Sequence, residues 1–248
     1  MNWVLKLLVC DLDGTVLPYG REAVSSECKR LLALAQERGV QVAISSGRTY
    51  GELARFLPEF TSSFYFICCD GAYTLIGERV LYTKPLTVGD VDELARRRLP
   101  ESGLLLHGIH NVYALGKVPA NAATYFSAAP AAGVRGIREE LYKITLYGQP
   151  VTLPAFSSLR VHWEGSDGRC TQMVDRYANK GVALSNLQMR LGISKFETAC
   201  IGDAENDIPM MRNAKYAVCI GERFPALRDV CNCFYSSAED AIGALLRD

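Results

Sequence analysis

Residues 4–15 read VLKLLVCDLDGT, an apolar run that ends in two aspartates, a glycine and a threonine. The nearly continuous apolar residues from Val4 to Cys10 predict a strand that is buried on both faces of a sheet. Asp11 and Asp13 then place two carboxylates at the end of this strand. A second acidic stretch, GDAEND at residues 202–207, follows another apolar run late in the chain. Because packed carboxylates repel one another unless a cation lies between them, the two stretches together suggest a metal site.

The bulk composition is that of a soluble globular protein. The 248 residues suffice for one large domain or two modest ones, with 49% hydrophobic and 22% charged residues. Lys plus Arg and Asp plus Glu both total 27, so there is no basic excess that would indicate a nucleic-acid partner. We see no signal peptide and no apolar run near the ~20 residues that span a bilayer, so no membrane partner is expected. The nine cysteines contain no C-x-x-C pair, which favours reduced thiols in a cytoplasmic protein.

Strand-like and helix-like segments alternate at both ends of the chain, which predicts an α/β fold. The expected strands are 4–10, 40–45, 64–68, 198–201 and 217–220, and the expected helices are 25–38, 51–57, 180–191, 208–213 and 237–247. Apolar strands separated by helices are typical of a doubly wound parallel sheet that is covered on both faces. Residues 73–76 and 79–82 flank Gly77-Glu78, which indicates a hairpin.

The pattern changes in the middle of the chain. Between residues 84 and 178, a polar helix at 88–98 is followed by short strand-like pieces at 103–107, 111–115, 141–147, 159–163 and 170–174. We therefore predict a small α+β domain at 84–178, inserted between the two parts of the core domain at 1–83 and 179–248.

Three of the predicted strands end in polar side chains that could share one site. Ligands of a doubly wound parallel sheet bind beyond the carboxyl ends of its strands. Asp11, Ser46 and Asp203 each lie at or just past such an end. We expect these residues at one edge of the sheet.

The residue types at this edge are suited to the hydrolysis of a phosphate monoester. Mg²⁺ between the carboxylates would let a phosphate dianion approach them. Asp11 could then attack phosphorus in line and form an aspartyl-phosphate. Asp13 could protonate the leaving oxygen and later take a proton from the hydrolytic water. Lys180 would supply positive charge where the transferring group gains negative charge.

Other side chains are candidates for binding the phosphate or the metal. Ser46 and Gly47 offer a hydroxyl and backbone N–H donors to phosphate oxygens, and Asn206 offers an amide. Asp203 is the best remaining metal ligand. Asp207 has three possible roles, namely direct metal binding, binding through water, and orientation of Lys180.

This set of motifs, in this order, resembles the haloacid dehalogenase-like hydrolase superfamily, and more narrowly its Cof-type phosphatases of subclass IIB. The matching pieces are residues 11–15, 46–48, 179–181 and 202–207 with Met210. The resemblance implies a Rossmann-like core, an inserted cap at 84–178, Mg²⁺ and phosphoryl transfer through Asp11. It also implies that Asp13 binds the metal through its backbone carbonyl.

One residue departs from the family pattern and has no assigned role, and others are candidates for contacts with the leaving group. Asp70 occupies a place where the family usually has asparagine, and a carboxylate cannot donate to a substrate as an amide does. The candidates for recognising the leaving group, all in the inserted block, are His107, His110, Arg160, His162 and Arg169.

The favoured function is a magnesium-dependent phosphatase of a small phosphorylated metabolite, such as a sugar phosphate. A phosphomutase resembling the phosphomannomutases and a non-enzymatic phosphate-binding regulator are the alternatives. The sequence leaves the substrate and the oligomeric state open.

Overall fold

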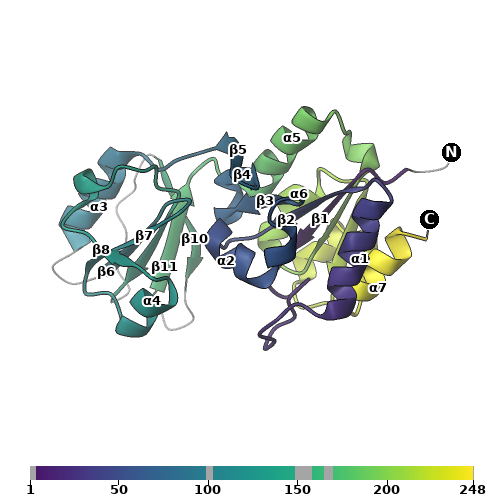
Figure 1. Cartoon of the computed structure of the whole chain (residues 1–248), viewed down its shortest axis with the longest axis horizontal. Helices are drawn as coiled ribbons and strands as arrows, with labels where there is room; N and C mark the ends of the chain where they lie inside the picture. The colour runs from purple at the N-terminus through teal and green to yellow at the C-terminus, as the bar shows by residue number, and fades with distance from the viewer. Residues whose placement is uncertain (1–3, 99–102, 149–157, 165–169, 248) are drawn as a thin grey trace. The chain divides into compact units, whose positions relative to one another are not determined.

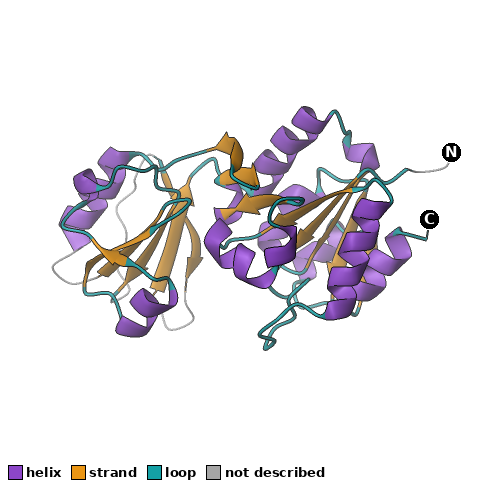
Figure 2. Cartoon of the chain, viewed as in Figure 1, coloured by secondary structure: helices purple, strands orange, loops and turns teal. Residues whose placement is uncertain are grey.

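A computed structural model describes residues 4–98, 103–148, 158–164 and 170–247. The chain divides into two compact units. The first comprises Met1–Gly47, Leu53–Tyr82 and Asn179–Asp248, and the second comprises Arg48–Glu52 and Thr83–Ala178. Figure 2 shows that each unit contains a sheet with helices beside it.

The first unit is built on an eight-stranded sheet whose order is β14-β13-β12-β1-β2-β3-β4-β5. Its parallel strands are β1 (Leu7–Asp11), β2 (Gln41–Ser45), β3 (Tyr65–Cys68), β12 (Thr198–Gly202), β13 (Tyr216–Ile220) and β14 (Cys233–Tyr235). The predicted hairpin is present as β4 (Tyr73–Ile76), which is antiparallel to β3, and β5 (Arg79–Thr83). β1 lies between β2 and β12, so the first and last thirds of the chain pair at the centre of this sheet.

Helices cover the sheet of the first unit, with α1 and α7 together on one side and α5 on the other (Figure 1). The helices that lie wholly in this unit are α1 (Ser26–Glu37), α5 (Lys180–Leu191), α6 (Ile208–Met211) and α7 (Ala238–Leu245), with 3₁₀ turns at Pro58–Phe60, Cys69–Gly71, Lys195–Glu197, Glu205–Asp207 and Pro225–Asp229. The helix α2 (Tyr50–Phe56) begins in the part of the chain assigned to the second unit and ends in the first. Side chains of β1 alternate between the two faces, and Leu7 and Val9 pack in one apolar core with Ala183, Leu184 and Met210.

Local sequence explains where the helices begin and end. The side chain of Ser25 accepts a hydrogen bond from the backbone N–H of Cys28 at 3.0 Å and caps α1. Asn179 caps α5 in the same way, by accepting from Val182 at 2.9 Å. Gly192 ends α5 in the left-handed conformation, with φ of 64°. The cap at Asn179 thus fixes the start of α5 at Lys180.

The second unit has a six-stranded sheet in the order β10-β11-β9-β6-β7-β8. Its strands are β6 (Gly103–His107), β7 (Val112–Gly116), β8 (Ala129–Pro130), β9 (Lys143–Tyr147), β10 (Leu159–Glu164) and β11 (Cys170–Asp175). The helices are α3 (Val88–Arg98), α4 (Ala120–Tyr125) and a 3₁₀ turn at Val134–Gly136. Leu104 and Leu106 of β6 form an apolar core with Val91 and Leu94 of α3.

The α/β class predicted from the sequence is confirmed, and the differences are local. The helix expected at 208–213 is shorter, since α6 ends at Met211 and a 3₁₀ turn precedes it. β14, β8 and α4 have no counterpart in the sequence prediction, because each is short and lacks a clear apolar period.

Candidate active site

The carboxyl ends of three neighbouring strands bring the predicted site residues of the first unit to one edge of the sheet. Asp11 is the last residue of β1, Ser46 follows β2 directly, and Asp203 follows β12 directly. All three are almost fully buried, with exposed fractions of 5%, 1% and 3%. The register of the parallel strands therefore places these side chains where the sequence predicted them.

Lys180 joins two of the acidic residues. Its Nζ lies 2.6 Å from Oδ1 of Asp11 and 2.6 Å from Oδ1 of Asp207. The lysine side chain and that of Asp207 are completely buried. Burial alone would lower the pKa of Lys180, but the carboxylates of Asp11 and Asp207, followed by that of Asp70, outweigh it and raise the pKa. Lys180 is therefore a buried cation at neutral pH.

Asp11, Asp203 and Asp207 form a cluster that could hold a metal ion. Their carboxylate ligand atoms all lie within 4.8 Å of one another. Burial raises the pKa of Asp11 against the opposing effect of Lys180, and burial likewise raises the pKa of Asp203. Within the described residues, the ammonium of Lys180 bonds the carboxylates of Asp11 and Asp207 but not that of Asp203, so one positive charge stands against three acidic groups. A set of oxygen ligands with this charge suits Mg²⁺, Mn²⁺ or Ca²⁺ rather than a metal that prefers sulfur or nitrogen.

Asp13 lies on a tight turn beside this cluster, and it is more exposed than Asp11. The turn is closed by hydrogen bonds from the backbone N–H of Gly14 to the carbonyl of Leu17 at 2.8 Å and from Leu17 to Leu12 at 2.7 Å. Within the described part of the chain, the carboxylate of Asp13 does not belong to the acidic cluster. Its predicted roles as acid–base catalyst and metal ligand stay predictions.

Gly14 lets this turn approach Asp203 closely. Its φ is +87°, and a Cβ atom there would lie 2.3 Å from Oδ2 of Asp203. A side chain at this position would therefore strain the backbone and displace the carboxylate. The glycine of the first motif is required because the last motif packs directly against it.

Asp207 also shapes the loop that carries Asp203. Its Oδ2 accepts hydrogen bonds from the backbone N–H groups of Asp203 and Ala204, both at 3.1 Å. A Cβ atom at Gly202 would lie 2.4 Å from the same oxygen. Asp207 thus contacts Lys180 through one oxygen and holds the loop after β12 through the other.

Two of the predicted phosphate-binding donors already have acceptors within the protein. The backbone N–H of Ser46 donates to the carbonyl of Ile67 at 2.9 Å, so this donor is not the free N–H that the loop suggested. Asn206 donates its amide to Oδ1 of Asp70 at 3.1 Å. The neighbouring Ser45 hydroxyl is fully buried, and it has no hydrogen-bond partner among the described residues. A buried hydroxyl of this kind next to Ser46 is a donor that sequence reasoning did not assign.

Asp70, which had no role in the sequence reading, is buried in the left-handed conformation. Its φ is 59°, and Cys69 before it also has a positive φ of 48°. The next residue, Gly71, has a φ of +87°, and a Cβ atom there would lie 2.3 Å from the carbonyl oxygen of Asn179. The strained turn therefore packs against Asn179, the N-cap of α5, and helps to place Lys180.

Tyr19 was missed by the sequence analysis, because a tyrosine between proline and glycine reads as an ordinary turn residue. Its hydroxyl donates to Oδ2 of Asp203 at 2.9 Å, and that of Thr15 donates to Oδ1 at 3.3 Å. Partial burial, followed by the hydrogen bond to Asp203, raises the pKa of Tyr19 to about 12. The guanidinium of Arg223 lies 5.1 Å from the centroid of its ring.

The second unit holds the candidate residues for leaving-group recognition. His107 is fully buried, with Nε2 2.9 Å from Oγ1 of Thr145, and its Nδ1 has no partner in the described residues. Burial, followed by the charge of Lys143, lowers its pKa well below 6.5. His110 is exposed. The side chain of His162 and all of Arg169 lie outside the described residues, and Arg160 donates to the carbonyl of Ala178 at 2.6 Å.

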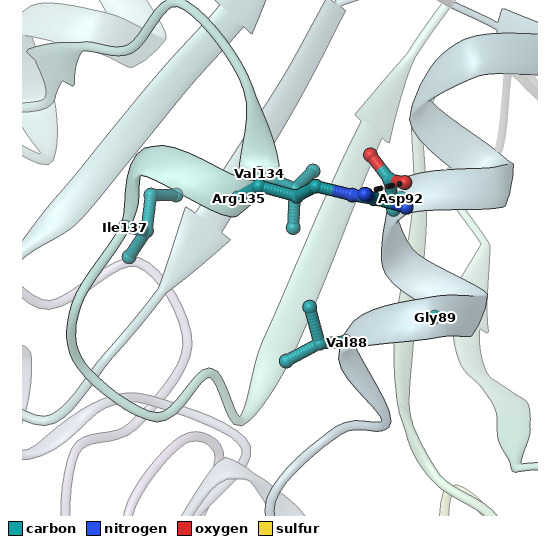
Figure 3. Close-up of a pocket in the computed structure, with 6 residues that line it drawn as sticks. All are labelled: Val88, Gly89, Asp92, Val134, Arg135 and Ile137. Atoms are coloured by element: carbon teal, nitrogen blue, oxygen red, sulfur yellow. Dashed lines mark hydrogen bonds and ion pairs between the residues drawn. The ribbon is translucent and has the colours of Figure 1, made fainter.

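A cavity of about 350 Å³ also lies in the second unit (Figure 3). It is lined by Val88, Gly89, Asp92, Val134, Arg135 and Ile137. Nε of Arg135 lies 3.1 Å from Oδ2 of Asp92 across it. None of the residues predicted for the site lines this cavity.

Comparison with known proteins identifies the family. The profile of the haloacid dehalogenase-like hydrolases matches residues 8–117 and 152–246. The chain belongs to this family. The resemblance drawn from the sequence motifs is thereby confirmed, and so is the expectation of a phosphoric monoester hydrolase, since similar proteins are named phosphatases.

Two relatives and two solved structures illustrate the similarity. The chain is 22% identical over 232 residues to 5-amino-6-(5-phospho-D-ribitylamino)uracil phosphatase YbjI of Escherichia coli, covering 86% of this chain and 84% of the relative. It is 27% identical over 252 residues to HMP-PP phosphatase of Serratia proteamaculans, covering 91% and 87%.

Among solved structures, the subclass IIB sugar phosphatase BT4131 matches with a TM-score of 0.78 at 19% identity, over 98% of both chains. A haloacid dehalogenase-like hydrolase from Bacteroides thetaiotaomicron matches with a TM-score of 0.82 at 21% identity, over 97% of this chain and 99% of the other. These two matches show that the fold is shared. Within the described residues, no helix combines the length and the apolar character needed to cross a bilayer.

Proposed function

We propose that the chain is a magnesium-dependent phosphatase that hydrolyses a small phosphorylated metabolite through an aspartyl-phosphate on Asp11. The observation that carries this proposal is the position of Asp11, 2.6 Å from Nζ of Lys180 and within the cluster that includes Asp203 and Asp207. A nucleophilic carboxylate needs nearby positive charge if a phosphate dianion is to approach it.

The proposed reaction has two displacements at phosphorus. A carboxylate oxygen of Asp11 attacks phosphorus, the bond from phosphorus to the ester oxygen breaks, and Asp13 gives its proton to the departing oxygen. Water then attacks phosphorus, Asp13 takes a proton from that water, and the bond to Asp11 breaks to release inorganic phosphate. Lys180 holds Asp11 in position and balances the charge of the transferring group.

The cation would be held by the carboxylates of Asp11 and Asp203, with contributions from the Asp13 carbonyl and from Asp207. Mg²⁺, when bound there, supplies positive charge beside the phosphate and polarises one of its oxygens. The hydroxyls of Ser46 and Ser45, the backbone of Gly47 and the amide of Asn206 are the proposed phosphate donors. The amide of Asn206 donates to Asp70 in this structure, so we propose that it is shared or released when substrate binds.

We propose that residues 84–178 act as a cap that selects the leaving group, and that the substrate is a small phosphorylated metabolite such as a sugar phosphate. Support comes from relatives of similar length whose printed names describe phosphatases of small phosphorylated compounds, and from the fold shared with a sugar phosphatase. The proposed participants of the second unit are Lys143 and His107, whose buried Nδ1 has no hydrogen-bond partner among the residues that the structure describes.

A screen of phosphorylated metabolites for phosphate release, with the whole chain and Mg²⁺, tests the proposal. We expect turnover by the parent protein, reversible loss of turnover with EDTA, and no turnover by Asp11→Asn. After a quench, the parent protein should carry a hydroxylamine-sensitive phosphoryl label that Asp11→Asn lacks. Steady turnover by Asp11→Asn would refute the nucleophile, and activity unchanged by EDTA would refute the metal.

The same screen separates the phosphatase from the alternatives. A hexose 1-phosphate converted to the 6-phosphate without free phosphate would indicate a mutase. Tight binding of a phosphorylated compound without turnover would indicate a regulator.

A further inference from the structure

Tyr19 stands out because most of its surface faces solvent while its hydroxyl reaches a buried carboxylate. The residue is 59% exposed, whereas Asp203 is 3% exposed. The ring therefore contributes little to the apolar core. Its distinctive contact is the hydrogen bond from the hydroxyl to Oδ2 of Asp203 at 2.9 Å.

Among the described residues, two side chains donate hydrogen bonds to the Asp203 carboxylate, and the bond from Tyr19 is the shorter. The bond from Thr15 to Oδ1 measures 3.3 Å, which is beyond the usual 2.5–3.0 Å range for hydroxyl donors, whereas that from Tyr19 lies within it. A carboxylate oxygen has two lone pairs, so Oδ2 can accept from Tyr19 and still offer an electron pair to a cation. The bond thus fixes the direction of the remaining lone pairs.

The position of the Tyr19 ring is itself fixed from two sides. A Cβ atom at Gly14 would lie 2.6 Å from Cε2 of Tyr19, so the ring lies directly against this glycine. The guanidinium of Arg223 lies 5.1 Å from the ring centroid, within the range of a cation–π contact. Tyr19 therefore ties the loop after β1 to the loops after β12 and β13, which carry Asp203 and Arg223.

We infer that Tyr19 is a positioning residue that orients the Asp203 carboxylate for the divalent cation. The inference rests on the metal site in the proposed function. Partners that hydrogen-bond to metal ligands raise metal affinity because the ligand is held in its binding orientation before the metal arrives. Removal of the hydroxyl alone should therefore weaken the binding of the cation and leave the fold and the chemical step intact.

Titration calorimetry of the metal-free whole chain with MgCl₂ tests this inference, with Tyr19→Phe compared to the parent protein. We expect Tyr19→Phe to bind Mg²⁺ about 10-fold more weakly, at the lower end of the range for lost outer contacts of a metal site. At saturating Mg²⁺ we expect kcat within about two-fold of the parent value. The midpoint of thermal unfolding without metal should fall by only a few degrees, because Asp203 loses one hydrogen bond but keeps the one from Thr15.

Tyr65→Phe is the matched control, since it removes the same hydroxyl from a tyrosine at the amino end of β3, away from the site. It should bind Mg²⁺ as the parent does. If Tyr19→Phe and the parent have equal Mg²⁺ affinities, the inference is wrong while the proposed function stands. If the parent itself does not bind Mg²⁺, both are wrong. A large loss of kcat in Tyr19→Phe at saturating Mg²⁺ would overturn the positioning role.

Discussion

Replacement of Lys180 by methionine should destabilise the metal-free protein strongly. Methionine keeps the apolar stem of the side chain, so the main loss is the ammonium group that lies 2.6 Å from both Asp11 and Asp207. Removing one partner of a buried ion pair typically costs about 3–5 kcal/mol, because the other charge stays buried without compensation. For a unit of this size, that loss corresponds to a fall in Tm of roughly 6–20 °C.

The same variant should bind Mg²⁺ more tightly than the parent protein, because the cation replaces the missing positive charge among the three carboxylates. Added Mg²⁺ should therefore restore part of the lost stability, although phosphate release should be absent. Urea unfolding with and without Mg²⁺ measures both effects. Lys6→Met is the control, since Lys6 also lies 2.6 Å from a carboxylate, that of Glu197, but its side chain is 50% exposed. Little change in stability is expected there.

The reasoning about Lys180 would be refuted in either of two ways. One is a free energy of unfolding for metal-free Lys180→Met that lies within about 1 kcal/mol of the parent value. The other is weaker Mg²⁺ binding by this variant, which would mean that the lysine does not compete with the cation for the carboxylates.

Three further predictions follow from other contacts. Gly14→Ala should weaken Mg²⁺ binding and lower stability, because its Cβ would lie 2.3 Å from Oδ2 of Asp203; an unchanged affinity in calorimetry would contradict this. Asp70→Asn keeps an acceptor for the amide of Asn206 and removes one negative charge. Inhibition by inorganic phosphate should therefore strengthen several-fold. Weaker inhibition would show that the charge of Asp70 does not repel the phosphate. The pKa of His107 in the folded protein lies below the 6.5 of the unfolded chain, so the unfolded chain takes up a proton first as the pH falls. The stability that the neutral imidazole contributes is therefore complete above pH 6.5, and below it the free energy of unfolding falls by up to about 1.4 kcal/mol per pH unit. Urea unfolding of His107→Gln should show a flatter decline below pH 6.5 than the parent or His110→Gln, and parallel curves would refute this.

The elements that the sequence predicted well are those with strong local signals. In β1, Leu7–Cys10 are apolar and all buried, although the strand begins three residues after the predicted start at Val4. α5 begins at an asparagine cap and ends at a glycine. Parallel strands bring their carboxyl ends to one edge, so Asp11, Ser46 and Asp203 could be grouped without knowledge of any contact.

What the sequence did not predict depends on partners that are distant along the chain. Tyr19 and its acceptor are separated by 184 positions, and Asn206 and Asp70 by 136. Such pairs have no spacing rule, since the tertiary fold alone decides which side chains meet. Likewise, the N–H of Ser46 has a backbone acceptor on β3, which a pattern of loop residues does not reveal.

The order of the strands has a consequence for the synthesis of the chain on the ribosome. β1 emerges early, yet one of its two neighbours, β12, begins only at Thr198. Until then β1 has an unpaired edge of apolar sequence, which is the kind of surface that promotes aggregation. Thr83–Ala178, by contrast, is continuous and emerges before β12. We expect nascent chains from which Ala178 has emerged, but Thr198 has not, to hold a folded second unit and to depend on chaperones for the first.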